Sequence, residues 1–150
     1  MKWLVLVHVL SAIIGVGPTF YAHVLMRKGQ SIEELRHSTK LSKRLDFFPK
    51  IGGTIAVISG FILYFTEDYG KFTQLWLLGS LILYIAIQAV VIGMLMPVSN
   101  RFAAWIHDPV NKDAKELPAE QLRLYRKANG LLYLASTLGT LLFILMIVKP

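Results

Sequence analysis

Residues 3–26 form an apolar stretch long enough to cross a bilayer as one helix, since ~20 residues at ~1.5 Å rise each span the hydrocarbon core. One line along the surface of this helix differs from the rest in the size and polarity of its side chains. From His8 through Ser11 and Gly15, the residues on that line up to Met26 are small or carry a hydroxyl. Leu, Ile and Val cover most of the remaining surface. The stretch therefore predicts a membrane helix with a lipid-facing side and a narrow side that another group can approach closely.

Three more apolar stretches follow, at residues 47–65, 74–96 and 130–148. Stretches of this length joined by polar segments predict α-helices, because a lipid-exposed backbone must satisfy its own hydrogen bonds. The chain has 150 residues, of which 55% are hydrophobic, which fits one domain of the membrane class. We therefore expect a single all-α domain over residues 1–150, a polytopic four-helix membrane bundle whose first partner is the lipid bilayer.

Lysine and arginine are distributed unevenly between the polar segments. Segment 27–50 holds seven and segment 97–129 holds six, whereas the N-terminus, the turn at 66–73 and the C-terminus hold one each. The positive-inside rule then places both long basic segments in the cytoplasm and both termini outside. The net charge of +7 is explained by this topology, so we predict no nucleic-acid partner. The expected location is a bacterial cytoplasmic membrane.

The basic segments are expected to contain helices of their own. Ser31-Ile-Glu-Glu34 is a capping box, which predicts a helix start with an amphipathic face. A short amphipathic piece should follow the third stretch as far as His107, because Asp108-Pro109 disfavours helix there. Leu117-Pro118 predicts another helix start, and this helix can continue through Asn129-Gly130 into the last stretch.

The second stretch carries the small-residue pattern Gly52-x3-Ala56-x3-Gly60. Small residues four apart let membrane helices approach closely. They also leave room for a flat cofactor. Both interpretations require the absence of side-chain bulk, so the spacing leaves both open.

His8 is the first candidate for chemistry. It lies inside the outer end of the first stretch, where a neutral imidazole able to bind metal is expected. Haem iron is commonly held by histidine, and the small residues that run inward from His8 would give a porphyrin room. The alternative is a buried histidine hydrogen-bonded to a neighbouring helix. Met146 and Tyr64 also lie near the outer ends of their stretches, at a depth similar to that of His8, and are possible second ligands of the iron. A five-coordinate iron, or one completed by a second copy in a homo-oligomer, is equally open.

A second candidate site is at the cytoplasmic ends of the first and third stretches. It contains His23, Met26, Met94 and Met96. Imidazole and thioether ligands suit Cu(I), so a copper-handling protein is the alternative function. Methionine that merely fills the end of the bundle is the structural alternative. A third hypothesis is a non-catalytic membrane scaffold whose basic loops dock a partner protein.

The order and spacing of several motifs resemble a known group. His8 is followed at twelve and thirteen residues by Phe20-Tyr21, Arg44-Leu45 and Pro49 open the second stretch, and Gly60 comes late in it. Arg126-x-x-Asn129 opens the last stretch, and the chain ends Val148-Lys149-Pro150. In these features the chain resembles small bacterial four-helix membrane proteins of unknown function that are related to HemJ-type protoporphyrinogen oxidase and to CopD-like copper-resistance proteins.

This resemblance implies a haem b held by the histidine at position 8, in a bundle that handles a tetrapyrrole or transfers electrons to a membrane redox partner. It implies that Ser11, Gly15, Gly60, Arg126 and Asn129 contribute to the cofactor site. An enzyme of this kind would be an oxidoreductase. Three positions that carry a charged residue in that group are uncharged here. They fall at Val24, within the Leu-Leu-Gly-Ser that follows Trp76, and at Gly130. The resemblance thus implies haem binding more strongly than oxidase activity.

Overall fold

A computed structural model describes all 150 residues and contains only helices, turns and loops. Four helical rods are long and apolar enough to cross a membrane, which confirms the expected all-α four-helix bundle. The elements in chain order are α1 (Lys2–Leu25), α2 (Ile32–Leu45), α3 (Phe47–Thr66), α4 (Leu75–Gln88), η1 (Ala89–Leu95), α5 (Met96–Ile106), η2 (Pro109–Asn111) and α6 (Ala119–Val148).

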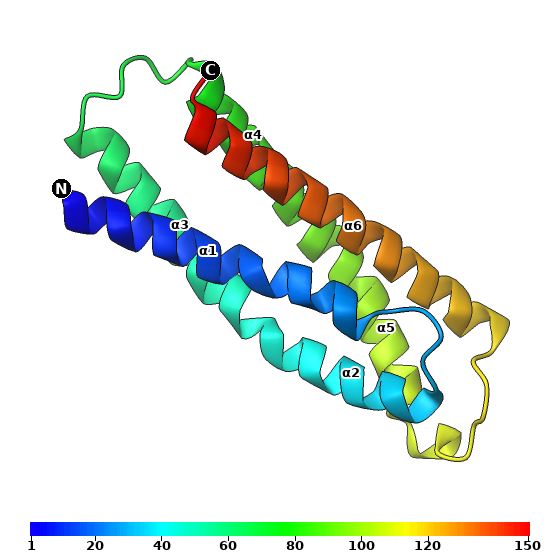
Figure 1. The fold of residues 1–150 in the computed structure, drawn as a ribbon. Coiled ribbons are helices and arrows are strands. Elements are labelled where there is room, and N and C mark those ends of the chain that lie inside the picture. The colour runs from blue at the N-terminus through cyan, green and yellow to red at the C-terminus, as the bar shows by residue number, and fades with distance from the viewer.

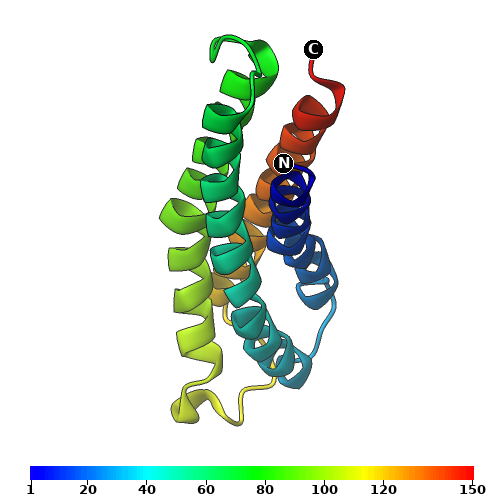
Figure 2. The ribbon, with the colours of Figure 1, turned by 90° about the vertical axis from the view of Figure 1, so that its left-hand side faces the viewer.

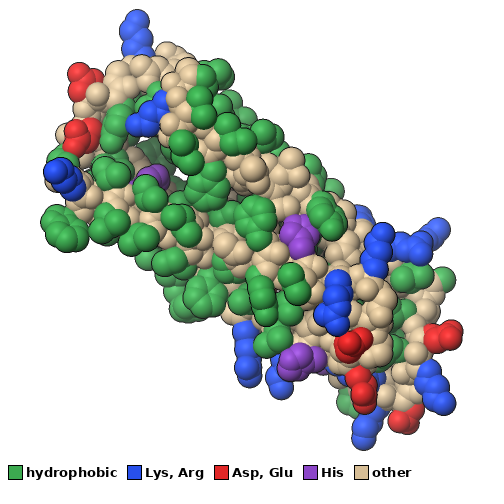
Figure 3. All heavy atoms as spheres, in the orientation of Figure 1, with side chains coloured by type: hydrophobic (Ala, Val, Ile, Leu, Met, Phe, Trp, Pro, Cys, Tyr) green, Lys and Arg blue, Asp and Glu red, His purple; other side chains and the backbone are tan.

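The two termini and the 67–74 turn lie at one end of the bundle, and the charged segments lie at the other (Figures 1 and 3). Helix α2, the end of α5 and the 107–118 connection gather there (Figure 2). The predicted arrangement, in which both basic segments share one side of the membrane, is thus compatible with the fold. We refer to the two ends as the outer end and the basic end.

The helices form two pairs. Helix α1 packs along α3, and α4 packs along α6, whereas α3 and α4 do not pack closely against each other. The pairs are joined where α1 meets α6 (Figure 2). At this crossing a Cβ added at Gly139 would lie 3.6 Å from Val16 Cγ1. The two helix pairs are therefore in contact in the middle of the bundle and at the basic end.

The most buried side chains lie at the basic end, outside the apolar spans. Phe102 and Ile106 of α5 are 1% and 0% exposed, and they pack with Ile32, Leu35 and Tyr125. Burying each of the two large side chains contributes ~1.5–3 kcal/mol when water is the alternative. Most apolar side chains of the spans are instead on the outside of the bundle, where a bilayer solvates them.

Several local expectations are confirmed. The Ser31 side chain accepts a hydrogen bond from the Glu34 N–H at 3.2 Å, and the Ser31 N–H donates to Glu34 Oε2 at 2.8 Å, which completes the capping box. Helix α5 ends at Ile106, before His107 and Asp108. Helix α6 continues without interruption through Asn129-Gly130.

The third apolar stretch contains a segment of π-helix that was not predicted. Over Ala89–Leu95 the turns of the rod are wider than in an α-helix. Pro97 follows at the start of α5, and in a regular α-helix its ring would clash with the carbonyl of Gly93, four residues earlier. A wider turn relieves that clash without ending the helix.

Candidate functional site

The His8 side chain lies between α1 and α3, about 9 Å along α1 from Lys2. Its Nδ1 is 2.8 Å from the carbonyl oxygen of Ala56 and 3.2 Å from Ser59 Oγ. A backbone carbonyl can only accept a hydrogen bond, so in the neutral ring Nδ1 carries the proton and donates it. Nε2 then holds the free lone pair, and no hydrogen bond in the structure occupies it.

Gly60 makes room for this imidazole. A Cβ added at Gly60 would lie 3.0 Å from His8 Cε1 and 3.4 Å from His8 Nδ1. Ser59 is buried beside it and donates to the Ile55 carbonyl at 2.6 Å. Gly60 was predicted to make room for a cofactor ring, and in the structure it makes room for the His8 imidazole. The contacts with α3 fix the orientation of this imidazole.

Ser11 and Gly15 lie in the close contact between α1 and α3. Both are buried, and a Cβ added at Gly15 would lie 2.9 Å from the backbone nitrogen of Gly53. A Cβ added at Gly52 would lie 2.7 Å from both Gly15 N and Ser11 O. The space beside Ser11 and Gly15 is therefore filled by the backbone of α3. Close helix packing accounts for these residues, and here they leave no room for a ring.

Arg126 and Asn129 are not brought together with His8. The Tyr125 hydroxyl lies 2.8 Å from the carbonyl oxygen of Met26 and 2.6 Å from that of Arg27, which fixes this part of α6 at the basic end. That level, at Met26, is about 27 Å along α1 from His8, more than the width of a porphyrin. One ring held by His8 cannot contact Arg126 or Asn129, because α6 runs antiparallel to α1 and begins at the basic end.

The outer end of the bundle is hollowed between the α1–α3 pair and the α4–α6 pair (Figure 3). Aromatic side chains gather there: the rings of Tyr64 and Phe72 are 5.2 Å apart, edge to face. Lys149 Nζ lies 5.4 Å from the ring centroid of Tyr69 and 5.1 Å from that of Trp76. Lys149 and these aromatic side chains thus lie at the same end of the bundle as His8.

The predicted copper ligands His23, Met26 and Met94 lie in different surroundings. The His23 ring bonds to Ser136 Oγ through Nε2 at 2.9 Å and lies 4.3 Å from the ring of Tyr133. Its Nδ1 is buried without a hydrogen-bond partner. Met26 packs against the core at the basic end, whereas Met94 on η1 is 46% exposed. The structure thus does not bring Met94 into the core with Met26.

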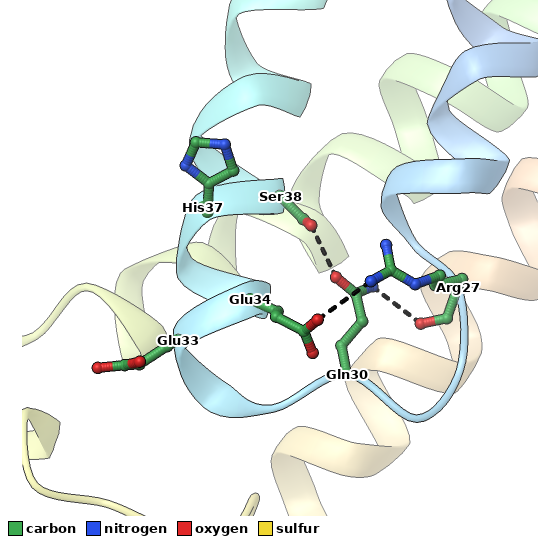
Figure 4. Close-up of a pocket in the computed structure, with 6 residues that line it drawn as sticks. All are labelled: Arg27, Gln30, Glu33, Glu34, His37 and Ser38. Atoms are coloured by element: carbon green, nitrogen blue, oxygen red, sulfur yellow. Dashed lines mark hydrogen bonds and ion pairs between the residues drawn. The ribbon is translucent and has the colours of Figure 1, made fainter.

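No group of three or more His, Asp or Glu side chains is arranged to hold a metal ion. Two other hollows are present. One of about 400 Å³ lies where α1 connects to α2, and it is lined by Arg27, Gln30, Glu33, Glu34, His37 and Ser38 (Figure 4). The other lies on η1, α5 and α6 and is described below.

The polar groups at the α1–α2 connection are largely paired with one another. Arg27 and Glu34 form an ion pair at 3.2 Å. The Gln30 amide donates to the carbonyls of Leu25 and Arg27 at 2.7 and 2.9 Å, and Ser38 Oγ donates to Gln30 Oε1 at 2.7 Å (Figure 4). These bonds satisfy carbonyls at the end of α1. Sequence analysis missed Gln30, because a lone glutamine in a loop has no recognisable capping pattern.

Comparison with known proteins gives a family. No curated protein and no solved structure matches the chain. A family model described as "Predicted integral membrane protein (DUF2269)" matches residues 2–150. With four membrane-length apolar helices and a match over nearly its whole length, the chain belongs to the DUF2269 family of integral membrane proteins.

Proposed function

We propose that this protein is a haem b-binding redox protein of a bacterial cytoplasmic membrane, related to the HemJ type, with His8 Nε2 as the axial ligand. The observation that carries the proposal is the hydrogen bond from His8 Nδ1 to the Ala56 carbonyl at 2.8 Å. Metal-binding histidines commonly donate their other ring nitrogen to a carbonyl, which fixes the tautomer and orients the ring.

The surroundings of His8 fit a haem ligand. The imidazole is held by a backbone carbonyl and by Ser59, while Nε2 is unoccupied. The close α1–α3 contact at Gly15 and Gly52 keeps this support rigid. Haem, when bound, supplies one-electron redox chemistry. The chain's own contribution is to hold and orient the ligand and to keep water away with apolar walls.

The rest of the site would lie at the outer end. That end holds the two termini and the 67–74 turn, so its cations are Lys2, Lys71 and Lys149. We propose these lysines, in place of Arg126, as the candidates for binding the ring carboxylates. The structure offers one imidazole there, so the proposal entails a five-coordinate iron or a site completed by a second copy.

The test is the haem content of variants purified from haem-replete cells, measured as a haem-to-protein ratio. His8→Ala removes the ligand and should abolish stoichiometric haem. His23→Ala is the matched control, because it removes another imidazole of the same helix at the other end of the bundle. Retention of full haem content in His8→Ala, or equal loss in both variants, would contradict the assignment.

Two glycine variants test the orientation of the ring. Gly60→Ala places a methyl group 3.0 Å from His8 Cε1, so the imidazole must shift, and we expect lower haem occupancy or an altered spectrum. Gly17→Ala adds a methyl group where no atom lies within 4 Å and should leave the spectrum unchanged. If Gly60→Ala behaves like Gly17→Ala, the imidazole does not hold the iron in this orientation.

The copper alternative is favoured by one observation, the buried Nδ1 of His23 that has no hydrogen-bond partner. It predicts stoichiometric Cu(I) binding that falls when Met94 and Met96 are both changed to Leu. The scaffold alternative predicts a protein without chromophore or metal that co-purifies with a partner. A colourless protein with bound copper would replace the haem proposal with the first alternative, and a colourless metal-free complex would replace it with the second.

A further inference from the structure

A hollow of about 210 Å³ lies at the basic end on the surface shared by η1, α5 and α6, and it is lined by Gly93, Met94, Pro97, Val98, Arg101 and Lys127. We propose that it binds an anionic phospholipid, whose phosphodiester group contacts Arg101 and Lys127 and whose acyl chain begins along Gly93 and Met94. This site is independent of the haem proposal, because it lies at the opposite end of the bundle from His8.

The π-helix gives the hollow its shape. The wide turns of Ala89–Leu95 end beside it, and a Cβ added at Gly93 would have no atom within 4 Å. Met94 is 46% exposed, while Val98 is buried and forms the floor. Short π-helical segments often occur at functional sites. Here the segment leaves an apolar recess open to the side of the bundle.

The two cations of the hollow have no acidic partner. Arg101 comes from α5 and Lys127 from α6, so the positive charge is set by the packing of two helices. The ion pair in the structure is the one between Arg27 and Glu34, and neither Arg101 nor Lys127 takes part in a side-chain hydrogen bond. Arginine and lysine side chains that have no acidic partner can bind a phosphate group.

The depth of these residues fits a lipid rather than a free ion. Gly93 and Met94 fall inside the third apolar stretch, 74–96, whereas Arg101 and Lys127 lie just outside the third and fourth stretches. The hollow thus crosses the level at which headgroups meet acyl chains. Basic pockets between membrane helices on the cytoplasmic side bind anionic headgroups. A free phosphate would use the cations alone and would gain nothing from the apolar recess.

The experiment is native mass spectrometry of the protein from micelles that contain equal amounts of phosphatidylglycerol and phosphatidylcholine. We expect retained phosphatidylglycerol on the wild-type protein. Since a cation near anionic lipid contributes about 5-fold in affinity, the double variant R101Q/K127Q should lose about 25-fold. R123Q is the matched control, because Arg123 is an exposed cation of α6 that does not line the hollow.

Two further arms separate a lipid from a free anion. Gly93→Leu fills the apolar recess without changing charge, and it should reduce phosphatidylglycerol retention while R123Q does not. Inorganic phosphate added in excess should not displace the lipid. The proposal is overturned if R101Q/K127Q retains phosphatidylglycerol like the wild type or if R123Q loses it equally. It is also overturned if Gly93→Leu has no effect or if phosphate displaces the lipid completely. Thermal unfolding of each variant confirms that the comparison is between folded proteins.

Discussion

Changing Gly52 to Ala should destabilise the pairing of α1 with α3 specifically. The added Cβ would lie 2.7 Å from Gly15 N and Ser11 O and 2.8 Å from Gly15 Cα, and backbone atoms cannot turn aside as a side chain can. The helices must separate by ~0.7–1 Å to restore ordinary contact, which forfeits a quarter to a half of the local dispersion energy. Overpacking of this kind costs ~1–3 kcal/mol.

Gly53→Ala is the matched control for this prediction. Both variants gain the helix propensity of alanine, ~1 kcal/mol, but a Cβ at Gly53 meets only the Tyr84 hydroxyl, at 4.0 Å. The difference between the two variants therefore isolates the packing cost. It should be ~2 kcal/mol in the free energy of unfolding, the middle of the overpacking range.

The assay is reversible unfolding by SDS titration in mixed micelles, followed by circular dichroism. Gly52→Ala should unfold at lower SDS fraction than Gly53→Ala. Ala56 and Ser59 lie one and two turns farther along α3, so the same shift should weaken their hydrogen bonds to His8 and lower haem occupancy. Equal unfolding free energies for the two variants would refute the inference that the α1 and α3 backbones are in direct contact.

Two further predictions concern the basic end. Ser31→Ala removes the capping bond to Glu34, so we expect ~1 kcal/mol lower stability and faster amide exchange in the first turn of α2, whereas unchanged exchange would contradict the capping role. Arg36 donates to the carbonyls of Ile106, at 3.0 Å, and of Asn111 and Lys112, at 2.7 and 3.0 Å. Arg36→Gln should therefore raise protease cleavage within 107–118, and cleavage no faster than in the exposed-cation control Lys40→Gln would refute this.

Sequence analysis predicted the fold well because the bilayer imposes strong rules. A stretch of ~20 apolar residues must be a helix in lipid, and each of the four predicted spans falls within one of the four long helices except for a single end residue, Met26 in the first and Gln74 in the third. The capping box at Ser31 and the continuation of α6 through Asn129-Gly130 follow from short-range backbone chemistry. These features depend on neighbours in the sequence, so a single chain suffices to predict them.

The candidate site was predictable only in part, because it depends on which helices pair. The small residues of the first stretch were correctly recognised as a surface of close approach. Sequence analysis could not say that the partner at Ser11 and Gly15 is the backbone of α3, whereas Gly60 instead admits the His8 ring. Arg126 entered the predicted site through a resemblance between motifs, and only the antiparallel course of α6 shows that it lies far from His8.

The π-helix and the Arg36 bonds were missed for a related reason. A π-helical turn has the same composition as an α-helical one, and Pro97 is the only local sign of it. Arg36 is one of seven cations in segment 27–50. Which of these cations forms the hydrogen bonds depends on where α5 ends and on where the 107–118 connection returns. Both are set by tertiary packing.

The most direct test of the central proposal is a visible absorption spectrum of the wild-type protein, purified from haem-replete cells, before and after dithionite. We predict a Soret band, α and β bands that sharpen on reduction, and loss of all three in His8→Ala but not in His23→Ala. A flat spectrum from folded wild-type protein at adequate concentration, or an unchanged spectrum in His8→Ala, would contradict the assignment of His8 as the haem ligand.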